Sequence, residues 1–357
     1  MALVDLRLQN FRSYTDNSFE LSPGVNIIVG PNASGKTNLL EAILVLARGS
    51  SYRARDGELI KFASEWARLD AHDEDNKLRT VKLQAQPNGV AKKSFEIDEK
   101  TYARLSLQKS LPLVLFEPNH LLMLSGSPEL RRIYLDDLLE QTVLGFGTVR
   151  RQYKRVLAQR NALLKQGLQV ARPQIFVWNL RLSELAGRIV KERLATLERI
   201  NALASSVYGT IADVSDSHIR LEYVSGLSLE HYETSLLKRF EHNLERDILL
   251  GFTTAGPHRD DLRVRLNGHP SQESASRGES RTIILTLKII ELQLIETSHE
   301  QPPMLLLDDV FSELDGKRRH ALTNYLQSYQ TFITTTDADV VVKHFMDNSH
   351  IIPTNNS

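Results

Sequence analysis

The spacing of apolar residues changes along the first third of the chain. Residues 4–8 alternate apolar with charged or polar side chains, which is typical of a half-buried strand. Residues 25–29 (VNIIV) follow a Pro-Gly turn signal and predict a second, buried strand. From Lys36 onward, apolar residues recur at helical spacing, so we expect a helix directly after this strand.

Further along, the pattern switches from strands to helices and back. Residues 66–98 predict short strands joined by polar turns, and from 128 to 250 apolar residues recur every three or four positions. Strands return at 262–266, which ends in an Asn-Gly hairpin signal, and then at 304–307 and 331–333. A strand-rich N-terminal part and a C-terminal part with strands and helices therefore flank a helical insert in the sequence.

Composition narrows the class of protein. The 357 residues carry 44 Lys+Arg and 44 Asp+Glu, so the net charge is zero, and there is no cysteine for disulfides or Cys-ligated zinc. The first residues indicate a strand and not a signal peptide, and no run of eighteen apolar residues occurs in the sequence. We therefore expect a cytoplasmic protein that spans no membrane.

The charge is unevenly distributed. Residues 131–199 hold fourteen Lys+Arg and six Asp+Glu, a surplus of eight positive charges in an otherwise neutral chain. A solvated helix face explains any single arginine, whereas the surplus favours an anionic partner.

One motif carries nucleotide chemistry. It is the phosphate-loop (Walker A) pattern G-x-x-x-x-G-K-[ST], and its residues are Gly30, Pro31, Asn32, Ala33, Ser34, Gly35, Lys36 and Thr37. A predicted strand precedes it and a predicted helix follows it, as such loops require. Lys36 is expected to reach the β- and γ-phosphates of ATP, and Thr37 to ligate Mg²⁺ through its hydroxyl.

A second acidic element completes the expected site. The apolar strand at 304–307 ends in Asp308 and Asp309, and ligands bind at the carboxyl ends of strands in open α/β sheets. Asp308 is expected to hold the Mg²⁺ shell, and Asp309 to orient or deprotonate the attacking water. Thr37 and Asp308 are separated by most of the chain, unlike the equivalent pair of simple GTPases and small-molecule kinases.

A Ser-x-Gly-acid tetrapeptide precedes a long apolar helix pattern. It comprises Ser276, Arg277, Gly278 and Glu279, which we call the signature turn. An ordinary helix N-cap explains Ser276. Gly278 weakens the start of a helix, so its presence there is explained if another group approaches the backbone closely.

The order of these motifs resembles that of ABC-type ATPases: a phosphate loop, a late signature, an acidic strand, then Ser-Glu-Leu-Asp at 312–315. Within that superfamily the chain resembles the RecF family of bacterial recombination mediators, which are related to SMC-type chromosome proteins. Residues 8–14, 116–132 and 256–261 (GPHRDD) carry this resemblance.

The resemblance implies an α/β fold: an ABC-type P-loop ATPase head, residues 1–110 and 250–357, with an inserted, mainly helical lobe, residues 111–249. It also implies a homodimer that closes on ATP, in which Ser276 and Gly278 face the γ-phosphate held by the partner chain. The implied function is slow, DNA-stimulated ATP hydrolysis in DNA replication, repair of DNA damage and the SOS response. DNA at single-strand gaps and the RecR and RecO proteins are the implied partners, and recombinase loading is the implied outcome.

The chain departs from the ABC pattern at three places. Glu279 stands where a glutamine is common, so we expect it to point away or to pair with Arg277 or Arg281. Asp309 replaces the more usual glutamate, which predicts slow turnover. No histidine occupies 334–337, so one of the threonines there is the expected γ-phosphate sensor.

Other polar residues leave alternatives open. His258, with Asp260 and Asp261, offers too few ligands for a metal and is expected to shape the nucleotide site or its dimer face. Arg53 and Arg55 are either solvated charges or contacts to DNA phosphates. The acidic stretch 71–77 is interpreted as a solvated turn.

Two other functions remain as alternatives. The energy subunit of an ABC transporter would need a membrane partner, and the positively charged helical lobe of this chain does not fit such a subunit. A small-molecule P-loop kinase would act as a monomer and would not need the signature turn.

Overall fold

The computed structural model describes residues 2–87, 89–336 and 349–354, which form two compact units. Unit 1 comprises residues 1–121, 210–212 and 291–357, and unit 2 comprises residues 122–209 and 213–290. Each unit is described separately below.

Unit 1 contains a parallel sheet. Its described strands lie in the order β14-β3-β13-β12-β8, and all neighbouring pairs are parallel. The bounds are β3 (Val25–Val29), β8 (Leu113–Phe116), β12 (Met304–Asp308), β13 (Thr331–Thr335) and β14 (Ser349–Pro353). The strands predicted at 25–29, 304–307 and 331–333 are confirmed. The sequence analysis did not predict β8 or β14.

A second, antiparallel sheet in unit 1 has the order β2-β1-β4-β5-β6-β7. Its bounds are β1 (Asp5–Phe11), β2 (Tyr14–Glu20), β4 (Trp66–His72), β5 (Leu78–Ala85), β6 (Ala91–Ile97) and β7 (Lys100–Tyr102). Leu6 and Leu8 are buried, as their alternation predicts. The sequence analysis did not predict β2, because most of its residues are polar and only its pairing with β1 makes it a strand.

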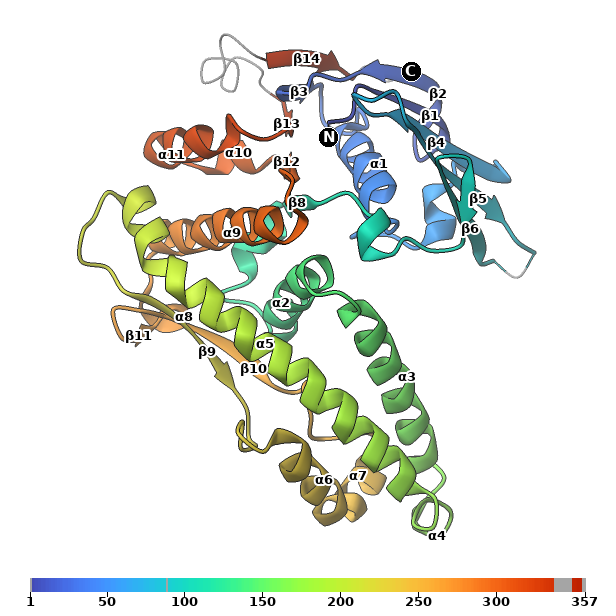
Figure 1. Cartoon of the computed structure of the whole chain (residues 1–357), viewed down its shortest axis with the longest axis vertical. Coiled ribbons are helices and arrows are strands. Elements are labelled where there is room, and N and C mark those ends of the chain that lie inside the picture. Colours follow the sequence, from blue (N-terminus) through green and yellow to red (C-terminus); the bar gives the residue numbers. More distant parts are fainter. Residues whose placement is uncertain (1, 88, 337–348, 355–357) are drawn as a thin grey trace. The chain divides into compact units, whose positions relative to one another are not determined.

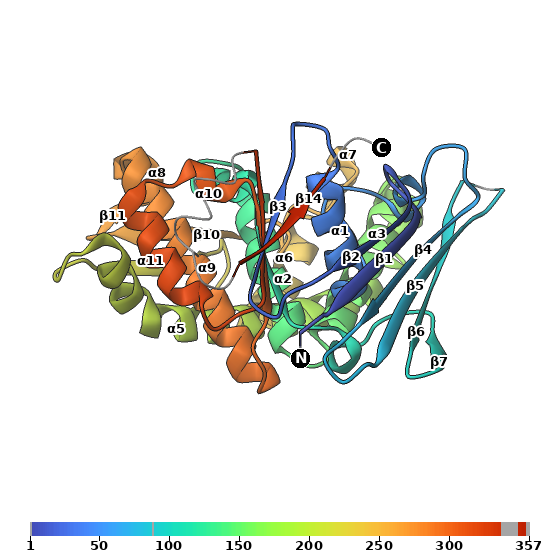
Figure 2. The same ribbon diagram turned by 90° about the horizontal axis from the view of Figure 1, so that it is seen from above.

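Helix α1 (Lys36–Arg48) lies between the two sheets (Figure 2). It contacts strands of both sheets, and ten of its residues are buried. Two further helices of this unit, α10 (Val310–Glu313) and α11 (Gly316–Leu326), lie on the other side of the parallel sheet (Figures 1 and 2). Because α1 fills the space between two sheets, its N-terminus is rigidly placed at the end of β3. Short 3₁₀ turns, η1 (Asp56–Leu59), η2 (Leu107–Lys109) and η3 (Pro118–Leu122), lie in the connections.

Unit 2 is mainly helical, as predicted for this part of the chain. Its helices are α2 (Pro128–Thr142), α3 (Phe146–Leu164), α4 (Leu168–Ala171), α5 (Ile175–Ala212), α6 (Tyr232–His242), α7 (Leu244–Leu250) and α8 (Ser271–Ser274); α9 (Arg277–His299) begins in this unit. At 38 residues, α5 is about 57 Å long.

A small antiparallel sheet also belongs to unit 2, with strands β9 (Ile219–Val224), β10 (Asp261–Leu266) and β11 (His269–Pro270) in the order β11-β10-β9. The hairpin predicted at Asn267-Gly268 joins β10 to β11, and both turn residues have positive φ, 50° and 83°. Strand β9 interrupts the predicted helical region, because its alternating residues Ile219 and Leu221 are buried on one face.

The contacts of residues 250–290 differ from the grouping used in the sequence analysis. That analysis placed them with the ATPase head, whereas they pack within unit 2 because β10 pairs with β9 along six residues. The division into functional domains remains a prediction.

A buried arginine ties the helices of unit 2 together. Arg160 of α3 is fully buried, and its Nη1 donates to Asp247 Oδ2 at 2.8 Å and to Thr253 Oγ1 at 2.7 Å. Its Nε donates to Asn179 Oδ1 of α5 at 2.7 Å, and the ring of Phe240 lies 4.4 Å from the guanidinium carbon. One charge therefore joins α3, α5, α6 and α7.

No helix in the described part of the chain is both long enough and apolar enough to cross a lipid bilayer.

Replacing Arg160 with leucine should lower the free energy of unfolding by about 3 kcal/mol, because it leaves the buried carboxylate of Asp247 without its cation. Chemical denaturation at neutral pH measures this change. Arg181→Gln is the matched control: it breaks an exposed ion pair with Glu184 and should cost less than about 1 kcal/mol. Equal effects of the two substitutions would contradict the role of Arg160.

Candidate nucleotide-binding site

The candidate site lies at the carboxyl edge of the parallel sheet in unit 1. Strand β3 leads into the phosphate loop and β12 ends at Asp308, with β13 between the two strands. The three strands are parallel, so their carboxyl ends meet at one edge. The sheet thus brings together segments that are far apart in the sequence.

The phosphate loop has the geometry that its glycines predict. Gly35 adopts φ 97°, a left-handed conformation that a side chain disfavours, and it directly precedes α1. At Gly30, a Cβ atom would lie 2.4 Å from the carbonyl oxygen of Thr354 and 2.6 Å from Ser34 Oγ. Both positions therefore require glycine for local reasons of backbone shape and space.

Thr354 is a contact of the loop that the sequence analysis missed. Its Oγ1 lies 2.8 Å from Ser34 Oγ, and its backbone N–H donates to the Val29 carbonyl at 2.8 Å. It follows β14, in a C-terminal segment for which no site residue was predicted. The only sequence signal there is the short apolar pair Ile351-Ile352.

The lysine and threonine of the loop point to different partners. Lys36 Nζ donates to the carbonyls of Gly30 and Pro31 at 2.7 and 2.9 Å, which places its charge over the loop. Thr37 Oγ1 donates to Asp308 Oδ1 at 3.0 Å, although the two residues are 271 positions apart. The structure therefore brings together the two residues expected to hold Mg²⁺.

Thr334 of β13 links the two aspartates. Its hydroxyl donates to Asp308 Oδ1 at 2.9 Å and accepts from the backbone N–H of Asp309 at 2.8 Å. Thr335 is buried, Thr336 is exposed, and Asp337 lies outside the described residues. Of the threonines considered as sensor, Thr334 is thus the one that touches both acids.

Asp309 and Asp308 have different surroundings. Asp309 is exposed, has φ 53° and begins α10, whereas Asp308 is buried. Tyr52 Oη donates to Asp308 Oδ2 at 3.1 Å. Burial, and next the charge of Asp308, raise the pKa of Tyr52, so it remains a neutral donor. The sequence analysis missed Tyr52, which lies in the loop after α1.

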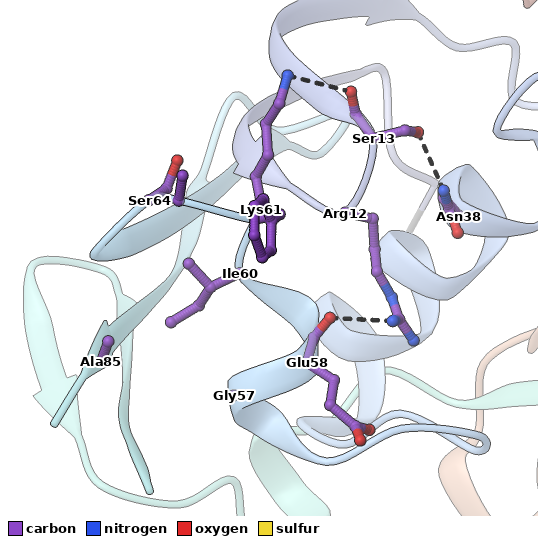
Figure 3. A pocket seen from close by; sticks show the side chains of 11 residues that line it. Arg12, Ser13, Asn38, Gly57, Glu58, Ile60, Lys61, Ser64 and Ala85 are labelled. Carbon is purple, nitrogen blue, oxygen red and sulfur yellow. Dashed lines mark hydrogen bonds between the residues drawn. The ribbon is translucent and has the colours of Figure 1, made fainter. Parts of the chain in front are cut away.

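Beside the start of α1 lies an open cleft of about 680 Å³ (Figure 3). Ser13 Oγ accepts from Asn38 Nδ2 at 3.0 Å, and Tyr14 Oη donates to the Gly35 carbonyl at 3.1 Å, so the β1–β2 turn holds the end of the phosphate loop. The cleft lining mixes polar and apolar groups and includes two cations; it comprises Arg12, Ser13, Asn38, Gly57, Glu58, Ile60, Lys61, Phe62, Ala63, Ser64 and Ala85.

A fully buried glutamate of α1 orders the arginines near this cleft. Glu41 accepts from Arg12 Nε at 2.8 Å and Arg12 Nη2 at 2.9 Å, from Arg53 Nη2 at 3.0 Å and from Ser51 Oγ at 2.5 Å. Burial by itself would raise the pKa of Glu41, but these hydrogen bonds outweigh it and hold that pKa below its ordinary value. Arg53 is thus fixed beside α1, while Arg55 is exposed on the adjacent η1 turn.

The signature turn lies in unit 2 and begins α9. Ser276 Oγ accepts from the backbone N–H of Glu279 at 3.2 Å, and the Glu279 carboxylate accepts from the backbone N–H of Ser276 at 2.8 Å. This is a reciprocal capping box. Glu279 was expected to point away or to pair with Arg277 or Arg281. In the structure its carboxylate instead contacts the backbone of the signature turn. The hydrogen bonds from Ser276 also lower the pKa of Glu279, so it remains charged.

Helix α2 holds the chain on both sides of the signature turn. Arg131 makes a two-point ion pair with Asp261 at the start of β10, at 2.9 and 3.0 Å. One turn later, Tyr134 Oη donates to the Leu287 carbonyl of α9 at 3.1 Å. Both residues are buried. The turn between β10 and α9 is therefore anchored at each end by one rigid helix.

His258 makes structural contacts within unit 2. Its Nδ1 lies 2.6 Å from Tyr153 Oη and its Nε2 3.2 Å from the Thr253 carbonyl, and burial lowers its pKa to about 4. Asp260 accepts from the hydroxyls of Tyr232 and Tyr223 at 2.6 and 2.9 Å. Within the GPHRDD motif, Asp260 is therefore buried in unit 2 and His258 is half-buried there, whereas Arg259 is exposed.

The residues of unit 1 suit a magnesium–triphosphate group. The loop leaves no room for a Cβ at Gly30, and the ammonium of Lys36 lies over it, which makes the loop suitable for an anion. The hydroxyl of Thr37 and the carboxylate of Asp308 lie beside it and are oxygen ligands of the kind that Mg²⁺ prefers. Among the described residues, no cluster of three or more His, Cys, Asp or Glu forms a separate metal site.

Comparison with known proteins gives the family. The RecF/RecN/SMC N-terminal domain pattern matches residues 2–356. A DNA replication and repair protein RecF from Lactobacillus johnsonii is 34% identical over 352 residues, covering 95% of this chain and 93% of that protein. The chain belongs to the RecF family. A relative of the same description from Halothermothrix orenii is 36% identical over 352 residues, covering 94% of this chain and 92% of its own.

Solved structures confirm the RecF fold. A structure of the recombination mediator protein RecF-ATPrS in the RecFOR pathway matches with a TM-score of 0.87 and 28% identity, covering 99% of this chain and 96% of that one. An SMC head bound to the C-terminal winged-helix domain of ScpA matches with a TM-score of 0.52 at 17% identity, which shows the likeness of fold alone. The predicted α/β fold of a RecF- and SMC-type ATPase head is therefore confirmed.

Replacing Glu41 with glutamine should lower the free energy of unfolding at neutral pH by about 2 kcal/mol, because two arginines lose their shared charge partner. The folded-state pKa of Glu41 is depressed, so its contribution is present above the ordinary carboxyl pKa and is lost as the pH falls through the depressed value. Urea unfolding of both proteins at falling pH should show the difference shrink. A constant difference across that range would contradict the charge-based role.

Proposed function

We propose that this chain is an ATP-dependent DNA-binding protein of replication and recombinational repair, with slow, DNA-stimulated ATP hydrolysis that acts as a switch. The observation that carries the proposal is the hydrogen bond between Thr37 and Asp308, which builds a phosphate-loop ATPase centre from the two ends of a RecF-family chain. Relatives matched over more than nine-tenths of their length are named DNA replication and repair proteins, and a solved relative is named RecF-ATP.

Residues of unit 1 hold the nucleotide in this proposal. The backbone of residues 30–37 wraps the phosphates, Lys36 neutralises them, and Thr37 and Asp308 hold Mg²⁺. Bound Mg²⁺ would offset the charge that develops on the phosphate oxygens. The cleft beside α1 takes the nucleoside part, where Asn38, Ser13 and Lys61 offer polar contacts.

Asp309 orients and deprotonates the attacking water. It is exposed at the strand end, while its backbone N–H is held by Thr334, which also contacts Asp308. A change at Asp308 would thus be transmitted to Asp309 through one hydroxyl, which makes Thr334 the proposed sensor of the γ-phosphate. An aspartate reaches less far than a glutamate, in keeping with slow turnover.

ATP joins two copies of the chain. Ser276, Arg277, Gly278 and Glu279 form the start of a 23-residue helix and belong to a different compact unit from the phosphate loop. A helix start favours an anion, so the signature turn of one copy contacts the γ-phosphate held by the other. Loss of the γ-phosphate would remove that contact and loosen the dimer.

DNA is the proposed partner of the closed dimer, together with the RecR and RecO mediators of the same pathway. Arg53 and Arg55, on the loop after α1, contact DNA phosphates; Arg53 is already fixed by Glu41 and Asn38, so it loses little conformational entropy on binding. Transporter and small-molecule kinase functions receive no support from the relatives and are not carried further.

Ser276→Arg should leave ATP affinity within about twofold and abolish the ATP-induced dimer, because a long cation replaces the hydroxyl at the anion-facing turn. Fluorescent-nucleotide titration measures the first quantity and light scattering with and without ATP the second. Lys36→Ala is the control and should lose both nucleotide binding and dimerisation. An ATP-dependent dimer of Ser276→Arg would refute the role of the signature turn across chains.

Asp309→Asn should lower the rate of ATP hydrolysis by about a hundredfold while ATP binding persists, because an amide cannot accept the proton of water. The ATP-bound dimer should then remain on gapped DNA for longer, as measured by dissociation in a gel or by surface plasmon resonance. Hydrolysis at the wild-type rate would exclude Asp309 as the water-activating group.

A further inference from the structure

The basic surplus of unit 2 is concentrated in one uninterrupted stretch of the chain. Residues 141–183 contain eight Lys+Arg and no Asp or Glu. Helix α3 carries five of these eight cations, and it runs beside α5 (Figure 1), to which Arg160 and Gln152 connect it by hydrogen bonds. The packing of α3 decides which of its charges face outward.

Some of these charges are used inside the fold. Arg150 lies within 3.3 Å of carboxylate oxygens of Asp136, Asp137 and Glu140, and Arg160 is fully buried against Asp247. These arginines have their counter-ions and contribute to packing rather than to binding.

Four other cations face solvent. Arg151, Lys154, Arg155 and Lys165 are all exposed, and none of them forms an ion pair with an Asp or Glu of the described residues. Arg151 donates only to the hydroxyl of Thr148, at 3.0 Å, among the hydrogen bonds of the described chain. Lys154 and Arg155 follow Arg151 by three and four residues, and Lys165 follows Arg155 by ten. These spacings place the four cations on one face of the helix.

The rest of this face is small and polar. Ala158, Gln159 and Ala162 are exposed between Arg155 and Lys165. Arg151 to Lys165 spans fourteen residues, or about 21 Å along the helix axis. We call the face formed by Arg151, Lys154, Arg155, Ala158, Gln159, Ala162 and Lys165 the α3 stripe.

We propose that the α3 stripe docks the sugar–phosphate backbone of duplex DNA. Four cations that form no ion pair with a described carboxylate lie along about 21 Å, and duplex DNA carries about twelve phosphate charges over that length of its axis, one per about 1.7 Å. The alanines let a backbone approach the helix closely while the longer cations reach past them to phosphates. Contact to phosphates alone makes the binding independent of base sequence.

The composition of the stripe separates duplex DNA from other anionic partners. Proteins that grip single strands stack bases on aromatic side chains, and the α3 stripe has none. A protein interface would need apolar or aromatic anchors at its centre, and the stripe offers only alanine methyl groups there.

This inference rests on the proposed DNA binding and deepens it. All residues of the α3 stripe belong to unit 2, whereas the phosphate loop belongs to unit 1. The stripe is therefore distinct from the phosphate loop and from the contacts assigned to Arg53 and Arg55.

The test uses the full-length protein with ATP present and a short fluorescein-labelled duplex of mixed sequence, from about 50 to 200 mM salt. The triple substitution Arg151→Gln, Lys154→Gln and Arg155→Gln should weaken binding at least about tenfold at the lowest salt. It should also make the slope of log K against log salt less negative by about 2.7, since each phosphate contact contributes about 0.9.

The matched control is Lys191→Gln, Arg199→Gln and Arg220→Gln, which removes three exposed charges elsewhere in unit 2. It should leave the slope within about one unit of wild type. If the slope of log K against log salt is unchanged in the α3 variant, the proposal is overturned, and an acidic protein surface becomes the expected partner of the stripe. Equal losses in both variants would overturn it in favour of a general charge effect. If the wild-type protein fails to bind any duplex in the presence of ATP, the proposed function itself is wrong, a result distinct from either outcome.

Discussion

The parallel pairing of β3, β13 and β12 is the constraint on which the candidate site depends. It brings Thr37 to within 3.0 Å of Asp308 across 271 positions of sequence, and it inserts Thr334 between the two aspartates. Helix α1, held between two sheets, fixes the orientation of the phosphate loop at the same edge. A site assembled this way can exist only when both ends of the chain are folded together, so nucleotide binding reports on the integrity of unit 1.

Buried charge has a parallel role in each unit. Glu41 gathers Arg12 and Arg53 around α1, and Arg160 gathers partners from α5 and α7. A charge inside a protein is costly unless it is paired and hydrogen-bonded, so each such centre fixes the relative placement of the elements that supply its partners. In unit 1 this fixes two arginines next to the cleft beside α1, and in unit 2 it fixes α3 against α5 and α7.

Several elements could be predicted from sequence because their signals are local. The glycines, Lys36 and Thr37 of the phosphate loop follow a fixed spacing, and the alternation of β1, the Asn267-Gly268 hairpin and the apolar strand β12 each reflect one periodicity. The predictions missed β2, β8, β9 and β14, whose pairing partners make them strands although their own patterns are weak. Thr354 and Tyr52 were missed for the same reason: neither has a motif around it, and each acts through a contact with a residue hundreds of positions away.

The sequence by itself determined the chemistry available to this protein: a phosphate loop, a paired acid at a strand end, a signature turn and a surplus of positive charge in the helical segment. These depend on residue type and on spacing within one element, which short-range sterics and hydrogen bonding dictate. Tertiary structure alone decided which of those groups meet and which remain exposed. It selected Thr334 to contact both acids, buried Asp260 of the GPHRDD motif, and turned Arg160 inward while Arg151 and Lys154 face solvent. Long-range packing makes these choices, because whether a side chain is buried depends on the elements packed against it from elsewhere in the chain.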